Sequence, residues 1–321
     1  MPERQPIRTV LVLHKDIDEV RPILAQRCGE VDVHFLDDLD QIETTLARVN
    51  PEAVLSISQS TFSGSAHRAA IDYPSVRWFH VGGSGYEYIV PWDHDRVTVT
   101  NGLGILAPFL AETTLAAMLM LNGNFLAYAQ QQRNRDWSPV FFRPLHGQTL
   151  LIVGLGKIGS LVAKNAKALG MRVLATRRTP APDPYVDEVH SDSALGALIP
   201  DADFVSLHVR MSEQTRGLID ATMMAAMKQG SFLVNTSRGP VVDEAALADA
   251  LASGHLGGAY LDVFETEPLS RESPLWDMPN TIITPHAADN VHDWVARFTD
   301  FFADNLVRWN ADQQLLNRVT P

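Results

Sequence analysis

The feature that most constrains this chain is a glycine turn between an apolar run and an amphipathic run. The apolar run at 149–153 ends in Gly154-x-Gly156-x-x-Gly159, and residues 160–169 continue with helical spacing. This order predicts a strand, a tight turn and a helix. In such a unit the first glycine makes the turn, the second lets the backbone approach a pyrophosphate, and the third lets helix and strand pack closely. The sequence therefore predicts a dinucleotide-binding unit, with a purely structural glycine turn as the alternative.

Length and composition narrow the classes of protein to consider. A chain of 321 residues is long enough for about two domains. Acidic residues outnumber basic ones by 38 to 26, a net charge of −12, which argues against general nucleic-acid or anionic-membrane binding. The single cysteine, Cys28, excludes an intrachain disulfide and argues against a metal site rich in cysteine, so we expect no metal. Because no apolar stretch approaches the ~18 residues of a membrane span and no signal pattern is visible, we expect a cytoplasmic protein.

Short β-rich runs alternate with helical runs along the whole chain. Strands that are apolar throughout and separated by helices predict α/β architecture, with doubly wound parallel sheets covered on both faces. The helix predicted at 106–126 has few charges, so we expect it to be buried between domains or in a subunit interface. The predicted strands are 10–13, 31–35, 53–57, 77–81, 97–101, 150–153, 172–176, 204–209, 232–235, 258–263 and 281–284, and the main predicted helices are 17–27, 39–49, 106–126, 160–169, 244–253 and 291–309.

Polar side chains suited to catalysis follow three of these strands. Arg238 comes after 232–235, Glu267 after 258–263, and His286 after 281–284. Ligands of open parallel sheets bind at this edge. An arginine can hold a substrate carboxylate and polarise a carbonyl, a histidine can protonate the carbonyl oxygen, and a carboxylate can orient the imidazole. Each residue alone has an ordinary surface or loop interpretation, but together they favour nicotinamide-dependent reduction of a 2-oxo acid.

The motifs, in their order and spacing, resemble the D-isomer-specific 2-hydroxyacid dehydrogenase family. The matching segments are 154–159, 235–244, 258–268 and 279–286, and the likeness runs from about residue 97 to residue 288. The resemblance implies that Arg238 binds and polarises the substrate, that His286 is the acid/base, and that Glu267 is its partner. It also implies that Asp262 supports the protonation of this pair.

The resemblance further implies how the chain is organised. It implies two Rossmann-like or flavodoxin-like domains with an active-site cleft between them: a discontinuous substrate domain at 1–100 and 288–321, and a dinucleotide-binding domain at 101–287. The backbone N–H groups of Ser84 and Gly85 would hold the substrate carboxylate, although a plain glycine loop is the alternative; Glu87 stands where the family usually has aspartate. Family members are usually homodimers joined through the nucleotide domain, which would use the apolar helix.

The residues after the second strand of the nucleotide unit indicate the cofactor. NAD-preferring members carry an acid about 20 residues beyond the glycines, to hold the ribose diol. Here Arg177 and Arg178 stand at that point, and Asp183 comes only after two prolines. A guanidinium pair suits a 2′-phosphate, so we predict NADP(H), with NAD(H) as the alternative cofactor. The residues predicted to bind the cofactor are Gly154, Gly156, Lys157, Ile158, Gly159, Thr176, Arg177, Arg178, Thr179, His208, Val209, Arg210, Thr236, Ser237, Arg238, Asp262 and His286.

These inferences favour an NADP(H)-dependent reductase of a small 2-oxo acid, such as glyoxylate or hydroxypyruvate, that forms the D-2-hydroxy acid. One alternative is an NAD(H)-using dehydrogenase for a bulkier oxo acid. Another, from a different class, is a nucleotide-sensing protein that resembles a corepressor. Glu267 counts against a formate dehydrogenase, whose pattern has glutamine at this position. The sequence does not define the side chain of the oxo acid or the physiological direction.

Overall fold

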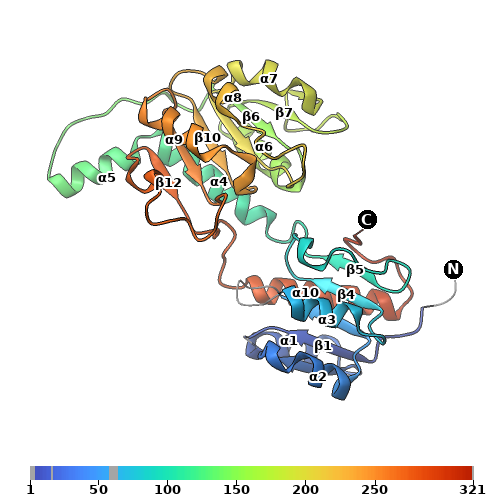
Figure 1. Cartoon of the computed structure of the whole chain (residues 1–321). Helices are drawn as coiled ribbons and strands as arrows, with labels where there is room; N and C mark the ends of the chain where they lie inside the picture. The colour runs from blue at the N-terminus through green and yellow to red at the C-terminus, as the bar shows by residue number, and fades with distance from the viewer. Residues whose placement is uncertain (1–3, 16, 58–63, 320–321) are drawn as a thin grey trace. The chain divides into compact units, whose positions relative to one another are not determined.

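The chain forms two compact units in a computed structural model that describes residues 4–15, 17–57 and 64–319. The first unit comprises Met1–Leu106 and Val291–Pro321, and the second comprises Ala107–Asn290 (Figure 1). Within the described ranges, no helix combines the length and apolarity that crossing a membrane requires. The expected α/β class with two doubly wound parallel sheets is confirmed.

The first unit is built on a five-stranded parallel sheet with the order β2-β1-β3-β4-β5. This is the strand order of the flavodoxin-like doubly wound fold. Its strands are β1 (Thr9–Leu13), β2 (Asp32–Leu36), β3 (Ala53–Ser56), β4 (Trp78–Val81) and β5 (Thr98–Asn101). Its helices are α1 (Ile17–Arg27), α2 (Ile42–Val49), α3 (Gly64–Asp72) and α10 (Trp294–Asn310).

The last helix of the chain completes the core of the first unit. The Trp78 ring, on β4, stacks on Phe302 and Trp309 of α10 at centroid distances of 4.7 and 5.6 Å. Three large aromatic side chains on one face of the sheet bury several hundred square ångströms of apolar surface between them, on the order of 150–250 Å² each. Helix α10, which follows the second unit in the sequence, therefore supplies part of the core of the first unit.

The second unit contains a seven-stranded parallel sheet with the order β12-β11-β10-β9-β6-β7-β8. Counted from β6, this is the dinucleotide-binding order 3-2-1-4-5-6 with one strand added. Its strands are β6 (Thr149–Val153), β7 (Arg172–Thr176), β8 (Glu188–His190), β9 (Phe204–Leu207), β10 (Phe232–Asn235), β11 (Gly258–Leu261) and β12 (Thr281–Ile283). Its helices are α4 (Ala107–Asn122), α5 (Phe125–Asn134), α6 (Lys157–Ala168), α7 (Leu195–Leu198), α8 (Ala221–Ala226) and α9 (Glu244–Ala252).

Both faces of the central strands of this sheet are buried, which explains why these strands are largely apolar. Leu150 and Ile152 of β6 belong to the core cluster beneath α4 and α6. Leu151 and Val153, which point the other way, belong to the cluster beneath α7, α8 and α9. Successive side chains of a strand alternate between faces, so a strand that is covered on both faces has no side chain that points into solvent.

The predicted helix at 106–126 is wrong in its extent. Helix α4 ends at Asn122 and α5 begins at Phe125, because Asn124 adopts a left-handed conformation with φ of 55°. The Asn124 amide donates to the carbonyl of Phe141 at 3.0 Å, a contact that the local sequence does not reveal. The buried face of α4 packs on α6, β10 and β11, whereas Leu119 and Met120 are 43% and 40% exposed.

Candidate active site

The glycine turn after β6 has the geometry of a pyrophosphate cradle. Gly154 has φ of +98°, and a Cβ there would lie 2.6 Å from the carbonyl oxygen of His208. A Cβ on Gly159 would lie 2.6 Å from the carbonyl oxygen of Gly154, which shows how closely helix and strand pack. At Gly156, the N-cap of α6, a Cβ would meet nothing among the described residues within 4 Å. A phosphate group can therefore approach the backbone at this helix N-terminus.

The order of the sheet brings the predicted catalytic residues to neighbouring strand ends. Strands β10, β11 and β12 are adjacent and parallel, so the loops that carry Arg238, Glu267 and His286 leave the same edge. Gly239 tightens this arrangement, because a Cβ there would overlap the backbone of Phe264 and Glu265. The arginine loop and the glutamate loop are thus in direct backbone contact.

Asn235 holds the loop that carries Arg238. Its Oδ1 accepts the backbone N–H of Ser237 at 3.1 Å and the Ser237 hydroxyl at 2.8 Å, and its Nδ2 donates to the carbonyl of Arg238 at 3.1 Å. The Arg238 guanidinium donates to the carbonyl of Ser237 at 2.7 Å. In the described part of the chain it has no carboxylate partner, so it is available to an anionic ligand.

His286 and Glu267 form a hydrogen-bonded pair. His286 Nδ1 lies 2.8 Å from Glu267 Oε2, and the two side chains are 49% and 38% exposed. The other oxygen of Glu267 accepts the N–H of Phe264 at 3.1 Å. Because the carboxylate occupies Nδ1, it fixes the ring orientation and leaves Nε2 to exchange a proton with a ligand.

Asp262 fixes the turn on which His286 stands. It is buried, and its Oδ1 accepts the Thr284 hydroxyl at 2.5 Å and the N–H groups of Ala287 and Ala288 at 2.7 and 3.0 Å. Its own carbonyl accepts the N–H of His286 at 2.8 Å. These contacts sustain the left-handed φ of 52° at His286, a conformation that a residue other than glycine keeps only where its surroundings enforce it.

Sequence reasoning missed two groups beside this pair. Tyr260 donates to the hydroxyl of Thr284, and burial raises the pKa of the phenol to about 12. Asp289, three residues after His286, has a raised pKa because of burial and the charge of Asp262, while His286 and Arg238 act in the opposite direction. No family motif quoted above contains an acid at this position; the only signal was an aspartate in the turn that follows the histidine.

Two arginines, Arg177 and Arg178, follow the end of β7. The backbone of Arg177 is tied to β8 by its N–H, which donates to the carbonyl of His190 at 3.0 Å. Within residues 4–15, 17–57 and 64–319, neither the Arg177 nor the Arg178 guanidinium has a hydrogen bond or an ion pair. Thr176 is buried and Thr179 is exposed. A pair of guanidinium groups at this strand end is free to bind phosphate.

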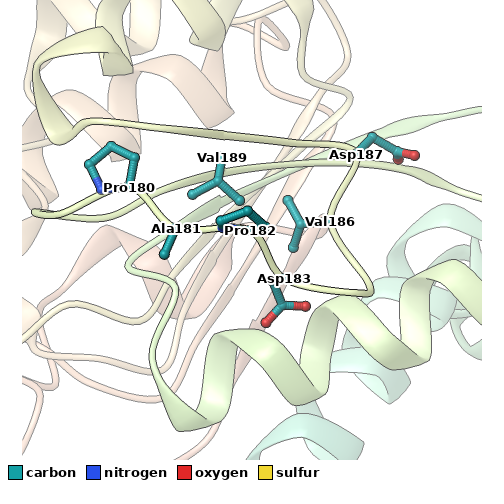
Figure 2. Close-up of a pocket in the computed structure, with 7 residues that line it drawn as sticks. All are labelled: Pro180, Ala181, Pro182, Asp183, Val186, Asp187 and Val189. Atoms are coloured by element: carbon teal, nitrogen blue, oxygen red, sulfur yellow. The ribbon is translucent and has the colours of Figure 1, made fainter.

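Asp183 is engaged elsewhere. Its Oδ2 accepts the Ser160 hydroxyl of α6 at 2.9 Å, and its Oδ1 accepts the N–H of Tyr185 at 2.9 Å. In Figure 2 its carboxylate points toward a helix and away from Pro180. This acid lines a surface cavity of about 280 Å³ that contains none of the predicted cofactor residues; the cavity is lined by Pro180, Ala181, Pro182, Asp183, Val186, Asp187 and Val189.

The loop after β9 borders the glycine turn from the other side, since β9 and β7 flank β6 in the sheet. Burial lowers the pKa of His208 to about 4, so its imidazole is neutral at pH 7. Its Nε2 pairs with the Ser206 hydroxyl at 2.9 Å, and its Nδ1 lies 3.5 Å from the hydroxyl of Thr236. Val209 follows it, and the Arg210 side chain is exposed.

The predicted substrate loop lies in the first unit. Asn101 fixes it by donating from Nδ2 to the carbonyl of Ser84 at 2.9 Å. In the part of the chain that the structure describes, the N–H groups of Ser84 and Gly85 donate to no other group. Arg238, Glu267 and His286 belong to the second unit.

A glycine turn at a helix N-terminus, with an arginine and a Glu–His pair at the neighbouring strand ends, defines the nucleotide-binding unit of a dehydrogenase. The family model described as the D-isomer-specific 2-hydroxyacid dehydrogenase, NAD binding domain, matches residues 115–288. The chain belongs to this family, and it is an oxidoreductase with an NAD(P)-binding domain.

Individual relatives differ in the substrate named for them. The chain is 31% identical over 313 residues to a glyoxylate reductase of Korarchaeum cryptofilum, covering 89% of this chain and 90% of that protein. It is 34% identical over 283 residues to a D-3-phosphoglycerate dehydrogenase of Mycobacterium bovis, covering 84% of this chain and 51% of the longer relative. A D-isomer-specific 2-hydroxyacid dehydrogenase of Xanthobacter autotrophicus, solved with NADPH and MES, is 28% identical with a TM-score of 0.81, over 99% of both chains.

Proposed function

We propose that this chain is an NADP(H)-dependent reductase that converts a small 2-oxo acid, such as glyoxylate or hydroxypyruvate, into the D-2-hydroxy acid. The observation that carries the proposal is the 2.8 Å pair of His286 and Glu267, at the same sheet edge as Arg238 and the glycine turn. The relatives named as glyoxylate reductases support the choice of a small oxo acid.

The chemistry follows from these side chains. Arg238 binds the substrate carboxylate and polarises the adjacent carbonyl. When NADPH is bound, its nicotinamide supplies the hydride for the carbonyl carbon. His286 donates the Nε2 proton to the carbonyl oxygen, and Glu267 stabilises the imidazolium before transfer. Asp262 keeps the imidazole in place through the turn at 286–288.

Phosphate recognition supports NADPH over NADH. The guanidinium groups of Arg177 and Arg178, which have no partner among the described residues, can bind a 2′-phosphate with charge-assisted hydrogen bonds. Asp183 is poorly suited to hold the ribose diol of NAD, because its two oxygens already accept the Ser160 hydroxyl and the N–H of Tyr185. Arg210 adds a further cation on the opposite side of the glycine turn.

The first unit supplies backbone contacts to the substrate in this proposal, in addition to those of Arg238. Residues 1–100 and 288–321 form the substrate domain, and 101–287 form the nucleotide domain. The N–H groups of Ser84 and Gly85 hold the substrate carboxylate, as paired backbone donors do in anion sites.

A homodimer through the nucleotide domain completes the proposal. Large apolar side chains gather on α4, α5 and the segment after them, with Trp137 100% exposed and Phe141 92% exposed. An apolar patch of this kind is typical of an interface with another protein chain. Sedimentation is expected to give twice the mass of a single chain.

We place the enzyme in the cytoplasm because one cysteine among 321 residues suits a reducing compartment.

Initial rates test this function. NADPH and NADH are compared side by side with glyoxylate, hydroxypyruvate and a bulkier acid such as phenylpyruvate. Fast oxidation of NADPH with a small acid, and slow oxidation of NADH, is the expected result. Comparable or reversed cofactor rates would overturn the NADP(H) assignment, and a preference for phenylpyruvate would overturn the small-substrate assignment. Cofactor binding without turnover on any acid would favour a nucleotide sensor.

A further inference from the structure

Glu244, the first residue of α9, is held by contacts outside its own helix. The helix N-terminus is already capped by Asp243, whose carboxylate accepts the N–H of Ala246 at 3.0 Å. The carboxylate of Glu244 is therefore not needed as a cap. Its Oε1 instead accepts the backbone N–H of Glu265, on the loop after β11.

This contact lies two residues from the partner of the catalytic histidine. Glu265 and Glu267 share one short loop, and Glu267 closes the loop on itself by accepting the N–H of Phe264 at 3.1 Å. Two successive backbone donors, those of Phe264 and Glu265, are thus bound by two different carboxylates. Apart from the contact between Glu267 and His286, this loop has no other side-chain anchor among the hydrogen bonds of the described residues.

The surroundings of Glu244 disfavour the ionised form of its carboxyl group. Burial raises the pKa of Glu244, and the charges of Glu265 and Glu267 raise it further, while the N–H of Glu265 lowers it. An acid half-buried beside two others is unfavourable unless it makes a contact that compensates. The only hydrogen bond recorded for its side chain in the described structure is the one to Glu265.

We propose that Glu244 is a positioning residue of the active site, which fixes the 264–267 loop so that Glu267 stays in hydrogen-bond contact with Nδ1 of His286. This inference rests on the proposed function. Glu244 touches neither of the reacting groups: it acts through the backbone of Glu265 on Glu267, and through Glu267 on the imidazole. Small displacements of the Glu267–His286 pair are expected to slow the reaction strongly, because a shift of about 1 Å in a catalytic group can lower the rate roughly 100-fold.

Two substitutions separate the hydrogen bond from the charge. Glu244→Ala removes the acceptor, whereas Glu244→Gln keeps an acceptor oxygen and removes the charge. We expect E244A to lower kcat for the oxo acid by roughly 10- to 100-fold, with little change in the Kd of NADPH. We expect E244Q to recover most of the lost rate. Asp249→Ala, at an exposed acid on the same helix, is the matched control and should leave kcat unchanged.

A double-substitution cycle tests whether the effect passes through Glu267. In an E267A background, E244A is expected to cost little further activity, because the group it positions is already gone. A second, equal loss in that background would overturn the proposal, as would wild-type kcat in E244A, or an E244Q defect as large as that of E244A. Urea unfolding of each variant identifies any loss that arises from instability alone.

A readout without substrate keeps this inference separate from the proposed function. Long-range ¹H–¹⁵N spectra of the cofactor-free chain report which ring nitrogen of His286 carries the proton. The signal of His286 is identified as the one that disappears in His286→Asn. We expect E244A to reduce the fraction protonated at Nδ1 and E244Q to retain it. An unchanged fraction in E244A would contradict the positioning role. If the wild-type chain reduced no oxo acid, the proposed function would fail while this spectroscopic result still stood.

Discussion

Gly239 lies directly against Phe264, so closely that a Cβ on the glycine would overlap the carbonyl group of the phenylalanine. Gly239 follows Arg238 in the chain, and Phe264 begins the loop that ends at Glu267. Arg238 and the partner of the histidine are therefore set relative to each other by backbone packing. Positions fixed in this way need no conformational ordering when a ligand arrives.

Replacing Gly239 by alanine is expected to disturb both loops at once. Overpacking of this kind costs about 1–3 kcal/mol of unfolding free energy, and we expect kcat to fall further than stability alone explains. Urea unfolding and initial rates measure the two effects. Gly196→Ala is the control, because a Cβ there would meet Met223 at an ordinary 3.6 Å within α7. A G239A variant as stable and active as G196A would show that the contact does not constrain the site.

Glu267→Gln tests the histidine pair. The amide keeps the shape of the side chain but cannot stabilise the imidazolium, so we expect kcat for the oxo acid to fall by roughly 10²- to 10⁴-fold. The KM of NADPH should change little, because no step of cofactor binding uses Glu267. Glu265→Gln, which alters an exposed side chain of the same loop, provides the comparison. Equal rates in the two variants would remove Glu267 from the mechanism.

The Arg177→Ala, Arg178→Ala double variant tests the cofactor assignment. Charge-assisted hydrogen bonds contribute about 1.5–3 kcal/mol each, so losing the pair is expected to raise the KM of NADPH at least 10-fold while the KM of NADH stays within about twofold. Steady-state kinetics with both cofactors give the ratio. Arg48→Ala, at an exposed cation of α2, controls for the general loss of positive charge. An unchanged KM for NADPH would rule out these two residues as the phosphate site.

Two histidines with lowered pKa values, His80 and His208, predict how stability depends on pH. Burial lowers the pKa of His80 to about 3 and that of His208 to about 4, from an ordinary value of 6.5. As the pH falls below 6.5, the unfolded chain binds protons that the folded chain does not, so the free energy of unfolding decreases. Above that pH this contribution is fully present and constant.

Urea unfolding between pH 7.5 and pH 5 measures this slope. The wild type is expected to lose stability steadily below pH 6.5, and His208→Asn to show a shallower slope because one of the two groups is gone. His94→Asn, at an exposed histidine, should retain the full slope. A wild-type stability that is flat from pH 7.5 to pH 5 would contradict the assignment of neutral imidazoles.

Much of the fold could be predicted because most strands of the two sheets are buried on both faces and are therefore apolar runs in the sequence. Arg238, Glu267 and His286 could be placed at one sheet edge for the same reason, since each follows such a run. Their roles in catalysis remain predictions. The contact between Glu267 and His286, seen at 2.8 Å, agrees with the pairing that the family resemblance implied.

Other features depend on contacts that no local pattern contains. The break between α4 and α5 arises at Asn124, whose amide reaches Phe141, seventeen residues further on. Asp262, at the end of a neighbouring strand, holds the turn at 286–288 in place through hydrogen bonds. Thr284 and Asp289 lie next to this turn in the sequence, and their surroundings depend on it. Glu244 begins a helix in the sequence, and only the packing of α9 against the next loop brings it to Glu265.

The most direct test of the proposed reaction is the turnover number of His286→Asn with NADPH and hydroxypyruvate, measured alongside the Kd of NADPH. Asparagine cannot donate a proton as imidazolium does, so kcat is expected to fall by roughly 10²- to 10⁴-fold while the cofactor binds as tightly as before. A variant that retained wild-type kcat would show that His286 is not the acid of this reaction, and the mechanism built on its pair with Glu267 would be wrong.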